Sequence, residues 1–221
     1  MSSEAKTPVK RSETGEMIHN AAILFVITLI AGILLGLVYQ ITKNPIKEQE
    51  LNKVKGAYLA VYPDAKEFGL DNIVDSEKAS ELLAKSDFAG ATINEVREAY
   101  DENKNVIGYV MQVTNKGYND NVSFSLGVTK DGILNGISLI SIAETPGLGM
   151  NAEVDIVPQY SVDGGLPTDQ VYEVVKDGSG KSDATDTKIE AISGATITSK
   201  AITAGVNAGL LYYQQVLKGG Q

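Results

Sequence analysis

The first feature of the hydrophobic pattern is an unbroken apolar run near the N-terminus. Residues 21–38 read AAILFVITLIAGILLGLV, without a charge and with Thr28 as the single hydroxyl. This run approaches the roughly 20 apolar residues that a helix needs to cross the hydrocarbon core of a bilayer. The pattern predicts one transmembrane anchor over residues 18–42, preceded by a polar arm over residues 1–17.

A cleaved signal peptide is the alternative interpretation of the apolar run. The hydrophobic region of a signal peptide is usually shorter, and Tyr39-Gln40-Ile41-Thr42 offers no small-residue cleavage site. An uncleaved anchor is therefore favoured. Lysine and arginine occur on both sides of the run, so the positive-inside rule assigns it no orientation.

Residues 43–90 are expected to form a stalk helix and a connecting segment. Asn44-Pro45 is typical of a helix cap followed by a first-turn proline, and apolar residues then keep helical spacing until Pro63. A second, short helix is predicted from Ser76, which would act as its cap, to Lys85.

From about Glu95 the period of the pattern changes to two, which predicts strands. Two alternating runs flank a turn at residues 101–105. Two further runs, 122–128 and 133–142, are joined by Lys130-Asp131-Gly132, and Asp-Gly between alternating apolar runs is a strong hairpin signal. The sequence thus predicts an antiparallel meander.

The C-terminal part adds two short strands and a helix to the prediction. The strands are expected at 171–175 and 189–192. Apolar residues at helical spacing over Thr198–Leu217 predict one helix that packs on the sheet, with Gly219 as its stop. The fold class is therefore α+β: a single N-terminal transmembrane helix, then a domain over 91–218 with an antiparallel sheet and packed helices.

Composition excludes several classes of function. The chain has 221 residues, a formal net charge of −9, no cysteine and one histidine. Nucleic acid is not an expected partner, because binding a phosphate backbone requires clustered lysine and arginine. Disulfides, thiolate catalysis and cysteine-ligated metal centres are excluded. The one histidine, His19, lies at the edge of the apolar run and is interpreted as an interfacial residue, which leaves Ser-His-Asp or Cys-His catalysis and multi-histidine metal sites without their parts. No catalytic side chain and no metal site is predicted, so a redox role would need a bound cofactor.

The candidate chemical centre is the segment Ser193-Gly194-Ala195-Thr196-Ile197-Thr198-Ser199. Small side chains and unpaired backbone N–H groups at the positive end of a helix suit a phosphate. Serine and threonine are also common helix caps, so a purely structural role is the alternative.

A glycine-rich segment, Glu144-Thr145-Pro146-Gly147-Leu148-Gly149, follows the fourth predicted strand. With Ala152, its glycines match the dinucleotide-binding fingerprint in spacing. The preceding strands are antiparallel and Pro158 follows closely, so the strand-helix-strand unit that the fingerprint requires is missing. A loop that brings backbone close to a flat or anionic ligand is expected instead.

Three segments together carry a family resemblance: Ser193-Gly194-Ala195-Thr196, Glu144-Thr145-Pro146-Gly147-Leu148-Gly149 and Lys116-Gly117-Tyr118. Behind one N-terminal span, they resemble the FMN-binding G subunits of Rnf membrane electron-transport complexes. The resemblance covers roughly residues 18–215. The similar C subunit of the sodium-translocating NADH:quinone reductase is one alternative, and a non-redox membrane-anchored binding module is another.

The resemblance implies a redox subunit of a ferredoxin:NAD oxidoreductase complex coupled to ion translocation, and not an independent enzyme. It implies covalent FMN, held by a phosphoester to Thr196 and attached by a flavin transferase. It also implies a place at the cell membrane with the FMN domain on the extracytoplasmic side. The implied partners are other membrane subunits and iron–sulfur subunits of the complex.

The implied FMN contacts surround the modified threonine. The residues expected to bind FMN are Thr196, Ser193, Gly194, Ala195, Glu144, Thr145, Gly147, Leu148, Gly117 and Tyr118. The chain departs from the family pattern at one position. The transferase motif usually has aspartate six positions before the modified threonine, where this chain has Glu190.

Overall fold

The computed structural model describes residues 13–180 and 187–218 and divides the chain into two units, 1–51 and 52–221. Most of the predicted polar arm, residues 1–12, and the predicted helix stop at Gly219 lie outside the described residues. Residues 13–17 already belong to the first helix.

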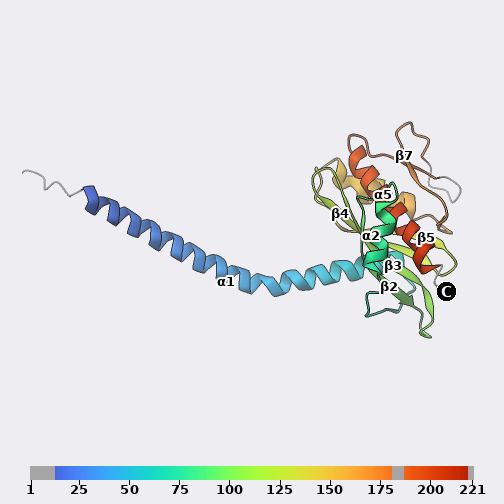
Figure 1. The fold of residues 1–221 in the computed structure, drawn as a ribbon, viewed down its shortest axis with the longest axis horizontal. Coiled ribbons are helices and arrows are strands. Elements are labelled where there is room, and N and C mark those ends of the chain that lie inside the picture. The colour runs from blue at the N-terminus through green and yellow to red at the C-terminus, as the bar shows by residue number, and fades with distance from the viewer. Residues whose placement is uncertain (1–12, 181–186, 219–221) are drawn as a thin grey trace, which may run out of the picture. The chain divides into compact units, whose positions relative to one another are not determined.

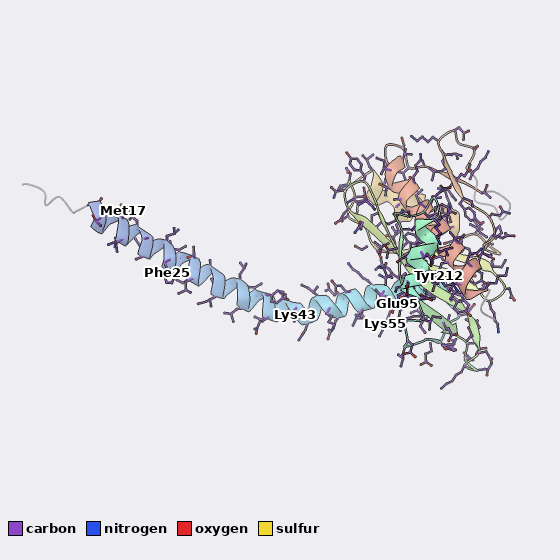
Figure 2. All side chains as sticks on the ribbon, in the orientation of Figure 1. Met17, Phe25, Lys43, Lys55, Glu95 and Tyr212 are labelled. Atoms are coloured by element: carbon purple, nitrogen blue, oxygen red, sulfur yellow. The ribbon has the colours of Figure 1, made fainter. Side chains whose placement is uncertain are left out.

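Helix α1 (Glu13–Val61) is a single helix of 49 residues, and it contains the apolar run. It is long and apolar enough to cross a membrane. In the part of α1 that belongs to the first unit of the chain, side chains such as Met17 and Phe25 point into open space (Figure 2). None of the described residues buries these apolar side chains, which are of the kind that a lipid environment would cover.

The prediction that a new helix starts at Asn44-Pro45 is wrong, because Pro45 lies inside α1. A proline removes one backbone donor and crowds the carbonyl four residues before it, at a cost of about 3 kcal/mol or more. That penalty is local. The long segments before and after Pro45 are both helical, so the helix continues through the proline. Its end at Val61 agrees with the stop predicted at Pro63.

The second unit is built on a six-stranded antiparallel sheet in the order β1-β2-β3-β4-β5-β6. The strands are β1 (Glu67–Phe68), β2 (Thr92–Tyr100), β3 (Val106–Lys116), β4 (Asn121–Thr129), β5 (Ile133–Ser141) and β6 (Leu166–Pro167). Neighbouring long strands are consecutive in sequence, which confirms the predicted meander and the α+β class.

One face of the sheet is covered by α5 (Thr196–Tyr212) and α2 (Ser76–Ala84) (Figure 1). Glycines let α5 approach the strands closely: a Cβ at Gly205 would lie 2.9 Å from the Phe124 ring. Helix α2 is capped by Asp75, whose side chain accepts the Lys78 N–H, and not by Ser76 as predicted. An aspartate before the first turn satisfies an otherwise unpaired donor.

The predicted C-terminal helix differs at both ends. Helix α5 begins at Thr196 rather than Thr198, because the Ser199 N–H already bonds to the Ala195 carbonyl at 3.0 Å and closes the first turn. From Tyr213 the chain continues as η2 (Tyr213–Leu217), a segment of wider π winding.

The opposite face of the sheet holds a second, smaller core. Its buried members are Tyr58, Val61, Tyr62, Ala65, Ala99 and Val110. The first two belong to the last turn of α1 and the last two to β2 and β3. The end of α1 is therefore part of the domain's own packing.

Short elements connect the sheet to α5. The loop after β5 leads into η1 (Gly149–Asn151), α3 (Ala152–Asp155) and α4 (Val157–Tyr160). No long helix follows the Gly147 loop, in agreement with the rejection of a dinucleotide fingerprint. Pro158 lies in the first turn of α4 rather than ending a helix.

A small parallel pair, β7 (Glu173–Val175) and β8 (Lys188–Glu190), stands apart from the main sheet. Both strands are shorter than the predicted 171–175 and 189–192. The pairing continues only to the bond from the Ala191 N–H to the Val175 carbonyl, after which the chain turns towards α5.

Candidate functional site

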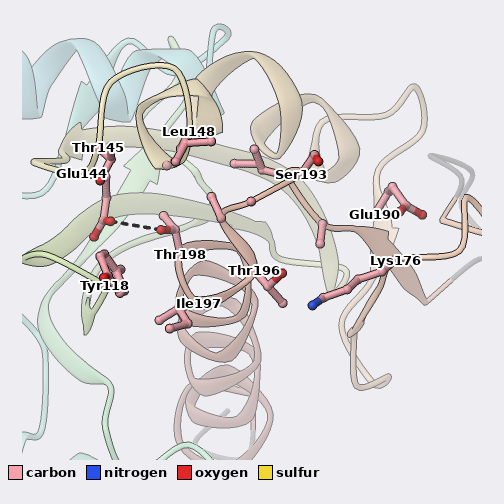
Figure 3. A pocket seen from close by; sticks show the side chains of 15 residues that line it. Tyr118, Glu144, Thr145, Leu148, Lys176, Glu190, Ser193, Thr196, Ile197 and Thr198 are labelled. Carbon is pink, nitrogen blue, oxygen red and sulfur yellow. Dashed lines mark hydrogen bonds between the residues drawn. The ribbon is translucent and has the colours of Figure 1, made fainter.

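A pocket of about 740 Å³ opens at the N-terminal end of α5 (Figure 3). Its volume falls in the range of roughly 300–1,000 Å³ that is typical of small-molecule sites. The lining comes from the α5 start, the loop after β5, and the segments after β3 and β7. The lining residues are Tyr118, Glu144, Thr145, Leu148, Gly149, Lys176 and 190–198.

The start of α5 presents free donors to this pocket. The backbone N–H groups of residues 196–198 come before Ser199, whose N–H is the first to donate within the helix, so they have no acceptor inside the helix. No residue within 13–180 or 187–218 accepts a hydrogen bond from them, and no side chain caps the helix. Three donors at the positive end of the helix dipole favour an anion.

The turn before α5 is held by its own hydrogen bonds. The Ile192 N–H donates to the Ser199 hydroxyl at 3.1 Å, and that hydroxyl donates to the Ala195 carbonyl at 3.0 Å. Gly194 adopts a φ of +77°, where a side chain would be strained, and a Cβ there would lie 3.0 Å from Leu148. The turn can therefore bring backbone close to Leu148 only because residue 194 is glycine.

Lys176 reaches the site through the register of the small parallel pair. Val175 lies opposite Glu190, so the residue after Val175 falls beside the turn that leads to α5. Figure 3 shows the Lys176 side chain extending towards Thr196. Within the described parts of the chain its ammonium group has no ion-pair partner. The pocket thus contains a cation beside a hydroxyl and free N–H donors.

Glu144 closes the other side of the pocket. Its side chain is buried and accepts hydrogen bonds from the Thr198 hydroxyl at 3.1 Å and the Asn119 N–H at 3.2 Å. Asn119 also donates its side-chain amide to the Ala143 carbonyl at 2.8 Å. Three segments that are distant in sequence therefore meet at one carboxylate.

The structure brings together most of the residues predicted to bind FMN. Eight of the ten line the pocket: Thr196, Ser193, Gly194, Ala195, Glu144, Thr145, Leu148 and Tyr118. Gly147 and Gly117 do not line it. Gly147 forms the open turn of its loop at a φ of +75°, and Gly117 lies against the Glu144 carboxylate, where it has no room for a side chain.

Several lining residues were not predicted as part of the site. Ile197 and Thr198 belong to the candidate segment 193–199 but were not among the expected FMN contacts, and Lys176 was not singled out at all. Lys176 follows a predicted strand, but only the pairing of β7 with β8 shows what that strand lies beside. Glu190, noted as a departure from the family pattern, lines the pocket and accepts the Gly180 N–H at 3.3 Å.

The chemistry of the lining fits a phosphorylated aromatic ligand. At one side lie the Thr196 hydroxyl, the free N–H donors and the Lys176 ammonium group, all suited to a phosphate. Leu148 and Ile197, which are 39% and 55% exposed, and Tyr118 supply apolar surface on which a flat ring system can pack. Among the described residues, no group of three or more His, Cys, Asp or Glu side chains is placed to hold a metal ion.

Comparison with protein families gives two matches in separate parts of the chain. A family described as the FMN-binding domain matches residues 117–211, and one described as the RnfG N-terminal region matches residues 12–61. The first match contains Thr196 and all other predicted site residues.

Proteins that are similar over most of this chain include two G subunits of ion-translocating complexes. The G subunit of the Na⁺-translocating ferredoxin:NAD⁺ oxidoreductase complex of Acetobacterium woodii is 34% identical, over 89% of this chain and 91% of the relative. The corresponding G subunit of the proton-translocating complex of Clostridium ljungdahlii is 31% identical, over 83% and 84%. Among solved structures, NqrC of Shewanella oneidensis aligns with a TM-score of 0.48 and 20% identity, over 59% of this chain and 64% of that one.

Proposed function

This chain belongs to the G-subunit family of Rnf-type ion-translocating oxidoreductase complexes, and on that premise we propose that it carries electrons through FMN bonded covalently to Thr196. It is a flavoprotein subunit of an Rnf ferredoxin:NAD oxidoreductase complex. The alternative of a quinone-reductase C subunit is less well supported, because the matching N-terminal family and the similar full-length relatives are of the G type.

One observation supports the covalent bond above all others: the Thr196 hydroxyl stands at the first position of α5, inside the pocket, at a helix start whose first three N–H groups have no acceptor among the described residues. A phosphoester at this hydroxyl would place its charged oxygens within the reach of those donors. The FMN would supply the redox chemistry. The residues of this chain would bind and orient it and hold the phosphate charge.

The remaining contacts follow from the lining. Lys176 would neutralise the phosphate, and Leu148, Ile197 and Tyr118 would pack on the ring system. Thr145 would offer a hydroxyl to the polar edge of the ring. Ser193, Gly194 and Ala195 would shape the turn, while Gly147 and Gly117 would act by supporting the neighbouring loops.

The experiment that tests the covalent site uses the full chain coexpressed with a flavin transferase. After denaturing electrophoresis, the wild type is expected to give a fluorescent band under ultraviolet light, and Thr196→Val is expected to give none. Intact-mass measurement should show an increment of FMN less one water. Thr145→Val is the matched control: it removes a hydroxyl that would contact the ring but leaves Thr196 in place, so a fluorescent band is still expected.

Two results would contradict the proposal. A wild type without fluorescence in the presence of the transferase would favour the non-redox binding module, in which Thr196 only starts a helix. A fluorescent Thr196→Val with a non-fluorescent Thr145→Val would move the attachment to the other hydroxyl.

The proposal extends to the position of the protein in the cell. It works with the other membrane and iron–sulfur subunits of the complex, takes its flavin from the transferase, and is anchored by α1 in the cell membrane with the FMN domain on the extracytoplasmic side. The relatives support membership of a complex, and the composition of α1 supports the anchor.

The side of the membrane can be tested directly because the chain contains no cysteine. Glu102→Cys places a thiol on an exposed turn of the domain, and Glu16→Cys places one near the start of α1. A membrane-impermeant maleimide added to intact spheroplasts should label the first variant and not the second. The reverse pattern would place the domain in the cytoplasm.

A further inference from the structure

The buried carboxylate of Glu144 has a fixed position that the FMN site alone does not explain. Only 6% of the residue is exposed. Its two oxygens accept the Asn119 N–H at 3.2 and 3.4 Å, and one of them also accepts the Thr198 hydroxyl at 3.1 Å. Thr198 is itself 1% exposed and belongs to the first turn of α5, two residues after Thr196. The carboxylate is thus tied directly to the turn that carries the attachment site.

Two glycines allow backbone to pack directly against the Glu144 side chain. A Cβ at Gly117 would lie 2.2 Å from the Glu144 Oε1, and a Cβ at Gly149 would lie 2.7 Å from the Glu144 Cβ and 2.8 Å from the Thr198 hydroxyl. Real Cβ atoms do not come so close, so both positions require glycine. Backbone at Gly117 and backbone at Gly149 therefore both pack against the Glu144 side chain.

The Glu144 carboxylate also has a defined position relative to the other residues that line the pocket. Figure 3 shows Glu144 and Tyr118 on one side of the α5 start and Lys176 on the other, with Thr196 facing Lys176. If the phosphate is bonded to Thr196, the ring system must extend along the pocket from there, and the Glu144 side offers the apolar and aromatic surface for it. The ring system would then lie near a fixed negative charge.

We propose that Glu144 is a positioning residue of the flavin site with two effects. Its carboxylate locks the 117–120 loop to the first turn of α5, and its charge lowers the reduction potential of the flavin. This inference rests on the proposed covalent FMN at Thr196. Reduction adds negative charge to a flavin, and a fixed carboxylate nearby, weakly screened inside the protein, raises the free energy of that state.

The experiment compares two variants that separate charge from hydrogen bonding. Glu144→Gln removes the charge with little change of shape, whereas Thr198→Val removes one hydrogen bond and keeps the charge. Both are made in the full chain carrying covalent FMN, and the flavin potential is measured by spectroelectrochemical titration. Glu144→Gln is expected to raise the potential clearly, and Thr198→Val to change it much less. Equal shifts in the two variants, or no shift in Glu144→Gln, would overturn the electrostatic effect.

The positioning effect is measured on protein without flavin, in the Thr196→Val background. Amide hydrogen exchange at Asn119 is expected to accelerate about tenfold or more when Glu144→Ala is added, because a charge-assisted hydrogen bond is lost. Glu144→Asp, with a shorter reach, should restore only part of the protection. Unchanged exchange at Asn119 would overturn the positioning effect.

These measurements separate this inference from the proposed function. If the wild type carries no FMN, the proposed function fails and the electrostatic effect fails with it. Hydrogen exchange in the flavin-free chain still supports or overturns the locking of the loop by Glu144. If FMN is present and the potential does not respond to Glu144→Gln, the inference fails while the proposed function stands.

Discussion

Val61, at the end of α1, lies directly over Gly127 in the middle of β4. A Cβ at Gly127 would be 2.9 Å from the Val61 Cβ and 3.1 Å from the Val61 carbonyl oxygen. In the same way Tyr62 lies over Gly108 on the neighbouring strand, where a Cβ would be 1.9 Å from the tyrosine oxygen. The two glycines form a seat for the helix end, which we call the α1 seat. Through it the last turn of α1 becomes part of the domain core.

Gly127→Ala should therefore destabilise the domain by about 1–3 kcal/mol, as overpacking of a tight contact does. The measurement is the free energy of unfolding in urea, made on the full chain in detergent. Gly56→Ala is the matched control, because a Cβ there meets nothing within 4 Å and the residue lies in the same helix. It should be neutral or stabilising by up to about 1 kcal/mol. Equal effects of the two substitutions would contradict the α1 seat.

Ser125 contributes a hydrogen bond to the α1 seat. Its buried hydroxyl donates to the Ala57 carbonyl at 2.9 Å, across from the sheet to the helix. Ser125→Ala removes one hydrogen bond between neutral groups, so we expect a loss of about 1 kcal/mol in the free energy of unfolding. Ser80→Ala, on an exposed surface of α2, should change it by less than about 0.5 kcal/mol.

Lys176 is expected to affect how much flavin is attached. Lys176→Gln removes the cation that faces Thr196, so the phosphate would be held less well while the bond forms. After a limited period of coexpression with the transferase, the flavin fluorescence per mole of chain should fall. Lys176→Arg keeps the charge and should restore much of the signal. If the glutamine variant is loaded as fast as the wild type, Lys176 does not face the phosphate.

Alkaline pH should destabilise the domain through its buried tyrosines. Burial raises the pKa of Tyr160, and burial together with the nearby Asp169 raises the pKa of Tyr172 to about 12. A tyrosine whose pKa is higher in the folded than in the unfolded state stabilises the folded state, and this contribution is fully present below the unfolded pKa of about 10. That contribution is lost as the pH rises towards the folded pKa. For the fully buried Tyr160 the loss is about 1.4 kcal/mol per pH unit.

Tyr160→Phe isolates this effect. At pH 8 the variant should be less stable by about 1 kcal/mol, because the bond from the Tyr160 hydroxyl to Thr203 at 2.8 Å is lost. Above pH 10 its free energy of unfolding in urea should fall less steeply than that of the wild type, so that the two curves converge. Parallel curves from pH 8 to pH 11 would show that Tyr160 ionises with little penalty in the fold.

The sequence by itself determined the elements whose signals are local. The apolar run specifies one membrane-spanning helix, and alternating residues around short turns specify the meander, because the turn residues and the period of two lie within a few positions of each other. The Ser193–Thr196 motif likewise marks the start of a helix and, through the family resemblance, the position proposed for the FMN. The local signal was misleading at Pro45, where helix on both sides outweighed one proline.

Only the tertiary structure decided which residues meet. Lys176 enters the pocket because β7 pairs in parallel with β8, and Glu144 reaches Thr198 across 54 positions of sequence. Gly127 is required by a helix that ends more than sixty positions earlier. Contacts of this kind depend on packing between segments that are distant in sequence. No hydrophobic period and no motif spacing in the sequence indicates which of these segments meet. The sequence therefore indicated Thr196 as the proposed attachment site and Glu144 as a residue near it, while the fold placed Lys176 beside Thr196 and brought Glu144 into contact with Thr198.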